Sequence, residues 1–193
     1  MNNARFWNEI AKQGAVLGSL LALSAIFELW GLLSGKLGLT MLMSVEWIAV
    51  AVIHYILLHR FTKQYSRQFP AEEGFTFWQG YSYQMLISLF AGILVGVVQA
   101  VALHQVIGYT NYIDRVMQST QSILASSGAL NPTTETLLSQ TFSQLESAQA
   151  PSVLATAWGG VVNELLFAAF FGLIIAGVLS RAPKLFGGEQ EEI

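Results

Sequence analysis

Residues 153–179 read VLATAWGGVVNELLFAAFFGLIIAGVL, a stretch in which Glu164 is the only charged residue. A membrane-spanning helix needs about 20 mainly apolar residues, so this stretch is long enough to cross a bilayer. The bilayer offers the backbone no water, and a single spanning segment therefore satisfies its hydrogen bonds by forming a helix. The stretch predicts a transmembrane helix.

Three further stretches are comparably long and apolar, at about residues 14–33, 40–58 and 84–107. They lack the alternation of apolar and polar residues that is typical of membrane-barrel strands. We therefore expect an all-α membrane protein with four transmembrane helices in a single membrane domain, residues 1–193. A long, partly helical outer loop, residues 108–150, would join the third helix to the fourth.

The composition of the 193 residues agrees with this class, since 53% are hydrophobic and 11% are charged. A soluble domain usually carries about 25% charged residues. Nine Lys and Arg against 12 Asp and Glu give a net charge of −3. The chain therefore has no excess of positive charge with which to bind a polyanion such as a nucleic acid. These values argue against a disordered chain, a nucleic-acid-binding protein and an ordinary cytosolic enzyme. The expected partner is the lipid bilayer.

The basic residues fall mainly on one side of the four-helix layout. Lys36 and Arg115 lie on the other side, whereas the N-terminal segment, the second loop and the C-terminal segment hold Arg5, Lys12, Arg60, Lys63, Arg67, Arg181 and Lys184. Lys and Arg accumulate in cytoplasmic loops, so we expect both termini in the cytoplasm.

The loop at residues 108–150 leaves two alternatives open. Residues 112–125 carry apolar side chains at helical spacing, and Asn131-Pro132 is typical of a helix start with Asn131 as the N-cap. These signs favour a helical hairpin over the outer mouth of the bundle. The many Ser and Gln residues are equally compatible with a solvated loop of partial helix.

Each expected span also carries polar side chains in its outer half, where an ionisable group is costly. The possible ion, proton or polar-cluster site consists of Glu28, Glu46, Gln99, Asn163 and Glu164. Carboxylates that meet inside a bundle cannot all remain ionised, so they would share protons or bind a cation. Two simpler hypotheses are that these groups form structural hydrogen bonds between helices, or that they contact a lipid headgroup.

Small residues recur at helical spacing on the same faces, and the expected packing positions are Gly14, Gly18, Gly92, Gly96, Gly160 and Gly172. Membrane helices approach closely where their side chains are small. Because Glu28, Gln99 and Glu164 share these faces, we expect them to point into the bundle rather than at lipid.

No catalytic or nucleotide-binding motif is present in the sequence. His54 and His59 are five residues apart, whereas metal ligands on one helix prefer a spacing of three or four, and there is no Cys. We expect a non-enzymatic protein with no cofactor and no metal site.

A family resemblance rests on the order of several motifs. They are Phe6-Trp7 before the first span, Gly74-Phe75-Thr76-Phe77-Trp78-Gln79-Gly80 before the third, and Tyr109-x-x-Tyr112-Ile113-Asp114 after it, followed by a long polar loop and a Gly-containing last span. This order resembles the domain of unknown function 4199 family of small four-helix membrane proteins, which are common in Bacteroidota. The resemblance covers essentially the whole chain. It implies a four-helix bundle in a bacterial inner membrane, and it brings no catalytic residue.

Two functions follow as expectations. The first is a membrane subunit or scaffold that assembles through the small-residue faces, as a homo-oligomer or with another membrane protein. The second is an oligomeric channel or transporter that uses Glu28, Glu46 and Glu164 for proton or cation passage.

Overall fold

The computed structural model describes residues 3–147 and 149–183, and this part of the chain is helical and contains no strand. Lys184, counted above among the basic residues, lies outside the described residues. Four helices within them are long and apolar enough to cross a membrane, which confirms the expected class. They are α1 (Asn3–Ser34), α2 (Leu37–Ser66), α3 (Phe77–Val101), which continues into the π-helical turn η1 (Ala102–Ile107), and α6 (Val153–Leu179).

The segment between η1 and α6 forms two further helices, α4 (Tyr109–Ser126) and α5 (Pro132–Ser147). The predicted N-cap of the second is confirmed, because the side-chain oxygen of Asn131 accepts hydrogen bonds from the backbone N–H groups of Thr133 and Thr134. These bonds satisfy N–H groups that the first turn of a helix leaves free. The position of this segment outside the membrane stays a prediction.

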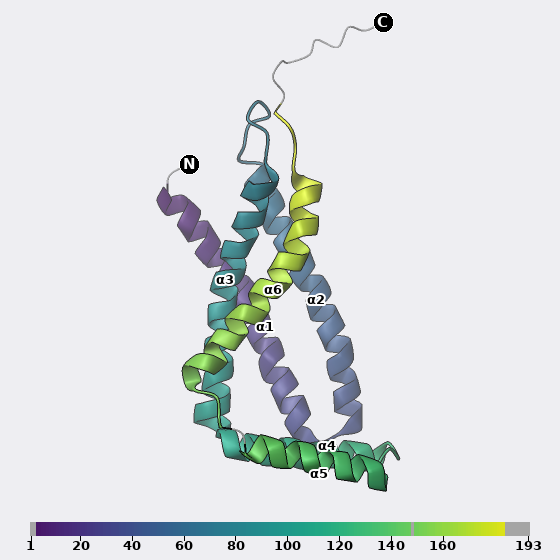
Figure 1. Ribbon diagram of the computed structural model, residues 1–193. Coiled ribbons are helices and arrows are strands. Elements are labelled where there is room, and N and C mark those ends of the chain that lie inside the picture. The colour runs from purple at the N-terminus through teal and green to yellow at the C-terminus, as the bar shows by residue number, and fades with distance from the viewer. Residues whose placement is uncertain (1–2, 148, 184–193) are drawn as a thin grey trace, which may run out of the picture.

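Figure 1 shows the four long helices running between the two ends of a bundle. The start of α1, the connection between α2 and α3, and the end of α6 lie together at one end, which we call the terminal end. α4 and α5 lie across the opposite end, the α4 end, together with the tight turn between α1 and α2. Most of the basic residues counted above are thus grouped at the terminal end. The side of the membrane that this end faces stays a prediction.

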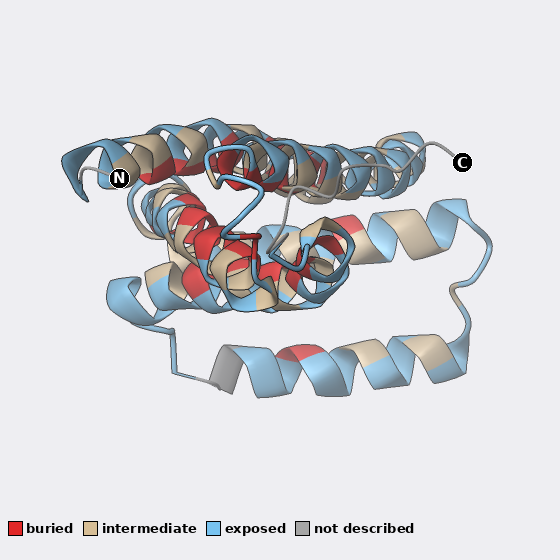
Figure 2. Ribbon diagram, turned by 90° about the horizontal axis from the view of Figure 1, so that it is seen from above, coloured by how far each residue is buried: buried red, intermediate tan, exposed pale blue. Residues whose placement is uncertain are grey.

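The central helix is α3, which packs most extensively against α6 and next against α1. All six glycines expected at packing positions are buried and face another helix of this chain. Between α3 and α6, a Cβ added at Gly96 would meet the backbone carbonyl oxygen of Ala157, and one added at Gly160 would lie 2.6 Å from the Cα of Gly96. The buried residues in Figure 2 gather on the inward faces of the central helices. The small-residue faces are therefore occupied within the single chain.

The helix α2 packs less closely than the other long helices. No residue between positions 37 and 53 is buried, and the first buried side chain of α2 is that of His54. The N-terminal half of α2 is therefore left with an apolar surface that nothing in the described chain covers.

Aromatic side chains close the terminal end. The rings of Tyr65 and Tyr83 stack with their centroids 3.9 Å apart, and Phe75 beside them is fully buried. Arg181 ties the end of α6 to this cluster, because its backbone exchanges two hydrogen bonds with that of Phe75 and its guanidinium donates to the carbonyl oxygens of Ser66 and Phe69. The terminal end is thus both packed and hydrogen-bonded.

The contact at Gly96 leads to a prediction about stability. Gly96→Leu would place a side chain against the backbone of Ala157, and we expect overpacking to lower the free energy of unfolding by about 1–3 kcal/mol. The matched control is Gly177→Leu on α6, since a Cβ at that position meets nothing within 4 Å. The free energies would be measured by denaturant titration in mixed micelles. An equal loss in both variants would contradict the assignment of Gly96 to a close helix contact.

Candidate functional site

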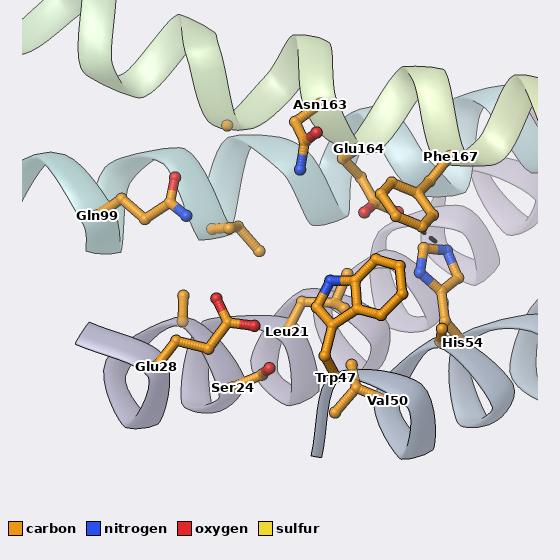
Figure 3. Close-up of a pocket in the computed structure, with 14 residues that line it drawn as sticks. Leu21, Ser24, Glu28, Trp47, Val50, His54, Gln99, Asn163, Glu164 and Phe167 are labelled. Carbon is orange, nitrogen blue, oxygen red and sulfur yellow. Dashed lines mark ion pairs between the residues drawn. The ribbon is translucent and has the colours of Figure 1, made fainter. Parts of the chain in front are cut away.

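A polar pocket lies between the four long helices. Its volume is about 120 Å³, and every long helix contributes to its lining. The polar side chains that line it are those of Ser24, Glu28, His54, Gln99, Asn163 and Glu164. Figure 3 shows, in its view, Glu28 and Gln99 on one side, His54 and Glu164 on the other, and the indole of Trp47 between them.

The deepest charged groups of this pocket are His54 of α2 and Glu164 of α6. Their side chains are 3% and 7% exposed, and Nε2 of His54 lies 3.2 Å from Oε1 of Glu164. The two atoms lie within ion-pair distance of each other, and neither of them makes a hydrogen bond in the structure. A buried ionisable group is stable only when an opposite charge, a shared proton or a hydrogen bond compensates its lost hydration. Each of these two residues supplies the compensation that the other needs.

The small-residue contact between α3 and α6 sets the position of Glu164. A Cβ added at Gly92 would lie 3.1 Å from the Cβ of Glu164 and 2.9 Å from the Cα of Val161. Only a glycine on α3 therefore lets α6 bring Glu164 so close to the centre of the bundle. On the other side of the pair, the ring of Phe167 stacks against the imidazole of His54 with the centroids 6.2 Å apart.

Glu28 and Gln99 connect the pocket to a second, larger cavity of about 340 Å³. Both residues line the two cavities, as does Ala25. The larger cavity extends toward the α4 end, where Tyr112 of α4 and Thr156 of α6 line it. Burial raises the pKa of Tyr112, and the neighbouring Tyr109 raises it further, so the Tyr112 hydroxyl keeps its proton. The two cavities are thus neighbours, and the larger one lies on the α4 side of the polar pocket.

Glu46 lies beside the pocket and does not line it. One carboxylate oxygen of Glu46 accepts a hydrogen bond of 2.6 Å from the hydroxyl of Ser24, which does line the pocket. The other carboxylate oxygen is buried and has no hydrogen-bond partner in the structure. Glu46 thus belongs to the same polar region through Ser24.

The structure brings together four of the five residues expected in the polar cluster, namely Glu28, Gln99, Asn163 and Glu164. Sequence reasoning missed the role of His54, which we expected only to be a poor metal ligand. A signal was available, because an imidazole in the middle of a span needs a polar partner by the same argument as a carboxylate. The helix that would supply that partner could not be identified from one sequence.

The arrangement suits proton exchange better than metal binding. Among the residues that the structure describes, no group of three His, Asp or Glu side chains is placed to hold a metal ion. His104 is engaged elsewhere, since its Nε2 lies 2.9 Å from the hydroxyl of Thr156. A carboxylate and an imidazole in contact can share one proton, and the state of each then depends on the other.

The contact between His54 and Glu164 predicts an energetic coupling. In a double-mutant cycle with His54→Gln and Glu164→Gln, we expect a coupling free energy of about 0.5–3 kcal/mol, because the two groups compensate each other in a water-poor site. The unfolding free energies would be measured in detergent at fixed pH.

The control cycle pairs His54→Gln with Glu46→Gln, which lies eight residues away on the same helix and is bonded to Ser24 instead. The two substitutions of the control should be additive. Additivity in both cycles would contradict the pairing of His54 with Glu164.

Comparison with known proteins identifies a family and leaves its activity open. No curated protein and no solved structure matches the chain. One family model matches residues 12–181, and its description is a protein of unknown function (DUF4199). The match covers α1 from residue 12 onward, the other three long helices, the two helices at the α4 end and every residue of the polar pocket. The chain belongs to the DUF4199 family.

Proposed function

We propose that this protein is a non-enzymatic membrane protein that takes up a proton at the His54–Glu164 pair and passes it across the membrane. The observation that carries the proposal is the contact of two almost fully buried ionisable groups inside four apolar helices. Ionisable residues are rare in membrane spans, and they are typical of ion pathways and proton relays.

The surroundings of the pair support a change of protonation. Glu28 on α1 lines the same pocket, α2 contributes His54, and α3 contributes the neutral Gln99. Glu46 on α2 faces the region through Ser24. Glu28, His54 and Glu164 thus line one pocket that has no Lys or Arg among its lining residues, and Glu46 lies beside it. A carboxyl group and an imidazole held together in this way can accept or release a proton as a unit.

The topology favours access from one end. The larger cavity reaches the pocket from the α4 end, whereas the stacked Tyr65 and Tyr83 close the terminal end. We place the protein in the bacterial inner membrane with both termini in the cytoplasm, following the distribution of Lys and Arg. The pocket would then receive protons from the outer side. Passage across the membrane would need a rearrangement at the terminal end or an oligomer.

Removal of the Glu164 carboxyl tests this function. In liposomes loaded with a pH-sensitive dye, we expect the wild-type protein to conduct protons after an acid step, and Glu164→Gln to conduct at least about tenfold less. Gln keeps the shape of the side chain and cannot exchange a proton. The control is Glu72→Gln in the exposed loop after α2, which makes the same change in net charge.

A measurement of folding and assembly makes the flux result decisive. Size-exclusion chromatography in detergent would establish that both variants are folded and assembled like the wild type. Equal proton flux in Glu164→Gln and the wild type, at equal assembly, would reject the pair as a proton site.

A second candidate function is a membrane subunit, and one observation favours it. Residues 37–53 of α2 include no buried residue, although they form half of a membrane-spanning helix. The six glycines expected as assembly faces are occupied inside the chain, so an assembly surface would have to lie elsewhere. We therefore assign the assembly surface to the exposed face of α2 that includes Val45 and Ile48.

Cysteine cross-linking tests the second candidate cleanly, because the chain has no cysteine of its own. In membranes, Val45→Cys should form a disulfide-linked dimer on mild oxidation if α2 faces a second copy. The control, Leu166→Cys, places the thiol on an equally exposed position of α6 and should remain monomeric. Monomers in both variants would rule out self-assembly through this face of α2.

A further inference from the structure

The larger cavity, of about 340 Å³, has mainly apolar walls. Side chains from α1, α2, α3 and η1 form these walls, chiefly Ile26, Leu29, Leu32, Met43, Val98 and Leu103. Small-molecule sites are typically apolar cavities of about this size with a few polar groups that fix the orientation of the ligand. The walls alone would accept any apolar chain, so the polar groups decide the class of ligand.

Glu28 is the only charged residue that lines this cavity. The other polar side chains are the amide of Gln99 and the hydroxyls of Tyr112 and Thr156, and no Lys, Arg or His is among the lining residues. An anion would meet a carboxylate here without any compensating positive charge. The charge of the cavity therefore selects for a cation.

The carboxylate of Glu28 lacks a partner among the residues that the structure describes. Its neighbours in the cluster are paired, Glu164 with His54 and Glu46 with Ser24, whereas no hydrogen bond or ion pair of Glu28 is found among the described residues. A half-buried carboxylate inside a membrane helix is costly without a counter-charge or a hydrogen bond. A bound cation would supply both.

The chemistry of the walls decides between an inorganic and an organic cation. Divalent metal ions require several oxygen ligands, and the cavity offers one carboxylate, one amide and two hydroxyls, the last two near its far end. The described part of the chain holds no group of three acidic or imidazole side chains for a metal. A cation with an apolar body, in contrast, would match both the carboxylate and the aliphatic walls.

We propose that this cavity binds a primary alkylammonium ion. Its ammonium group would donate hydrogen bonds to the carboxylate of Glu28 and the amide oxygen of Gln99, and its alkyl chain would lie along the apolar walls toward η1. An ammonium group has three N–H donors and needs acceptors only, which is what Glu28 and Gln99 provide. The inference goes beyond the proposed proton site, because binding at Glu28 does not require the His54–Glu164 pair to titrate.

Hexylammonium is the probe that tests the site. In detergent, we expect it to bind the wild-type protein in equilibrium dialysis and to raise the midpoint of thermal unfolding in proportion to its concentration. Hexanol has the same chain without the charge, and ammonium chloride has the charge without the chain, so both should bind at least about tenfold more weakly. Glu28→Gln should weaken the binding of hexylammonium by a similar factor, because the amide leaves the ammonium without a counter-charge.

Three control variants separate the possible outcomes. Glu72→Gln, far from the cavity, should bind hexylammonium like the wild type. Ala102→Leu fills the cavity wall while keeping Glu28, and it should also weaken binding. Glu164→Gln should retain binding even if it abolishes proton flux, so a failure of the proton site and a failure of this site give different results.

The same chemistry can come from a free amine or from the ammonium headgroup of an aminolipid. Native mass spectrometry of the purified protein distinguishes the sources, because a bound aminolipid would appear as an added mass that hexylammonium displaces. Stronger binding to hexanol than to hexylammonium would overturn the proposal and leave an unselective apolar cavity. Unchanged binding in Glu28→Gln would overturn it as well.

Discussion

The contact between α3 and α6 is the constraint on which the rest of the molecule depends. Gly96 and Gly160 bring the two backbones together, and Gly92 lets the Cβ of Glu164 approach the same helix. Membrane helices gain little from hydrophobic attraction to each other, because the lipid around them is equally apolar, and they associate through close packing instead. The same glycines that hold α3 to α6 thus fix the depth of Glu164 in the bundle. Packing and the polar site are two results of one helix contact.

The buried polar groups of this region are compensated in two ways, and one carboxylate is left without compensation. His54 and Glu164 compensate each other by ion-pair contact, and Glu46 receives a hydrogen bond from Ser24. Glu28 alone has no partner in the described chain, and it faces both cavities. A static support for four helices would need none of these carboxylates, since small residues and aliphatic side chains already pack the bundle. The unpaired carboxylate of Glu28 and the buried pair of His54 and Glu164 are therefore the features that packing does not explain.

Much of this architecture could be predicted from the sequence, because the length and the apolar composition of a span follow directly from bilayer thickness. The four long helices, the start of α5 at Asn131 and the inward direction of Glu164 were all indicated by local patterns. The pairing of His54 with Glu164 could not be predicted, since it depends on the rotation of α2 relative to α6, and helical spacing within one chain segment does not fix that rotation. The sequence also could not predict that all six glycines pack against helices of the same chain. A face of small residues has the same sequence pattern whether its partner helix belongs to the same chain or to another.

The central claim is that Glu164 and His54 exchange a proton within the membrane. Infrared difference spectroscopy of the protein in lipid, recorded between acid and alkaline pH, observes the carbonyl stretch of a protonated carboxyl group directly. The account predicts a titrating carboxyl band that is missing from the spectrum of Glu164→Gln and is shifted in that of His54→Gln, because the imidazole contacts the carboxyl oxygen. A band for Glu164 that does not change over the whole pH range in which the protein stays folded would contradict the account. In that case the pair would be a fixed structural contact between α2 and α6.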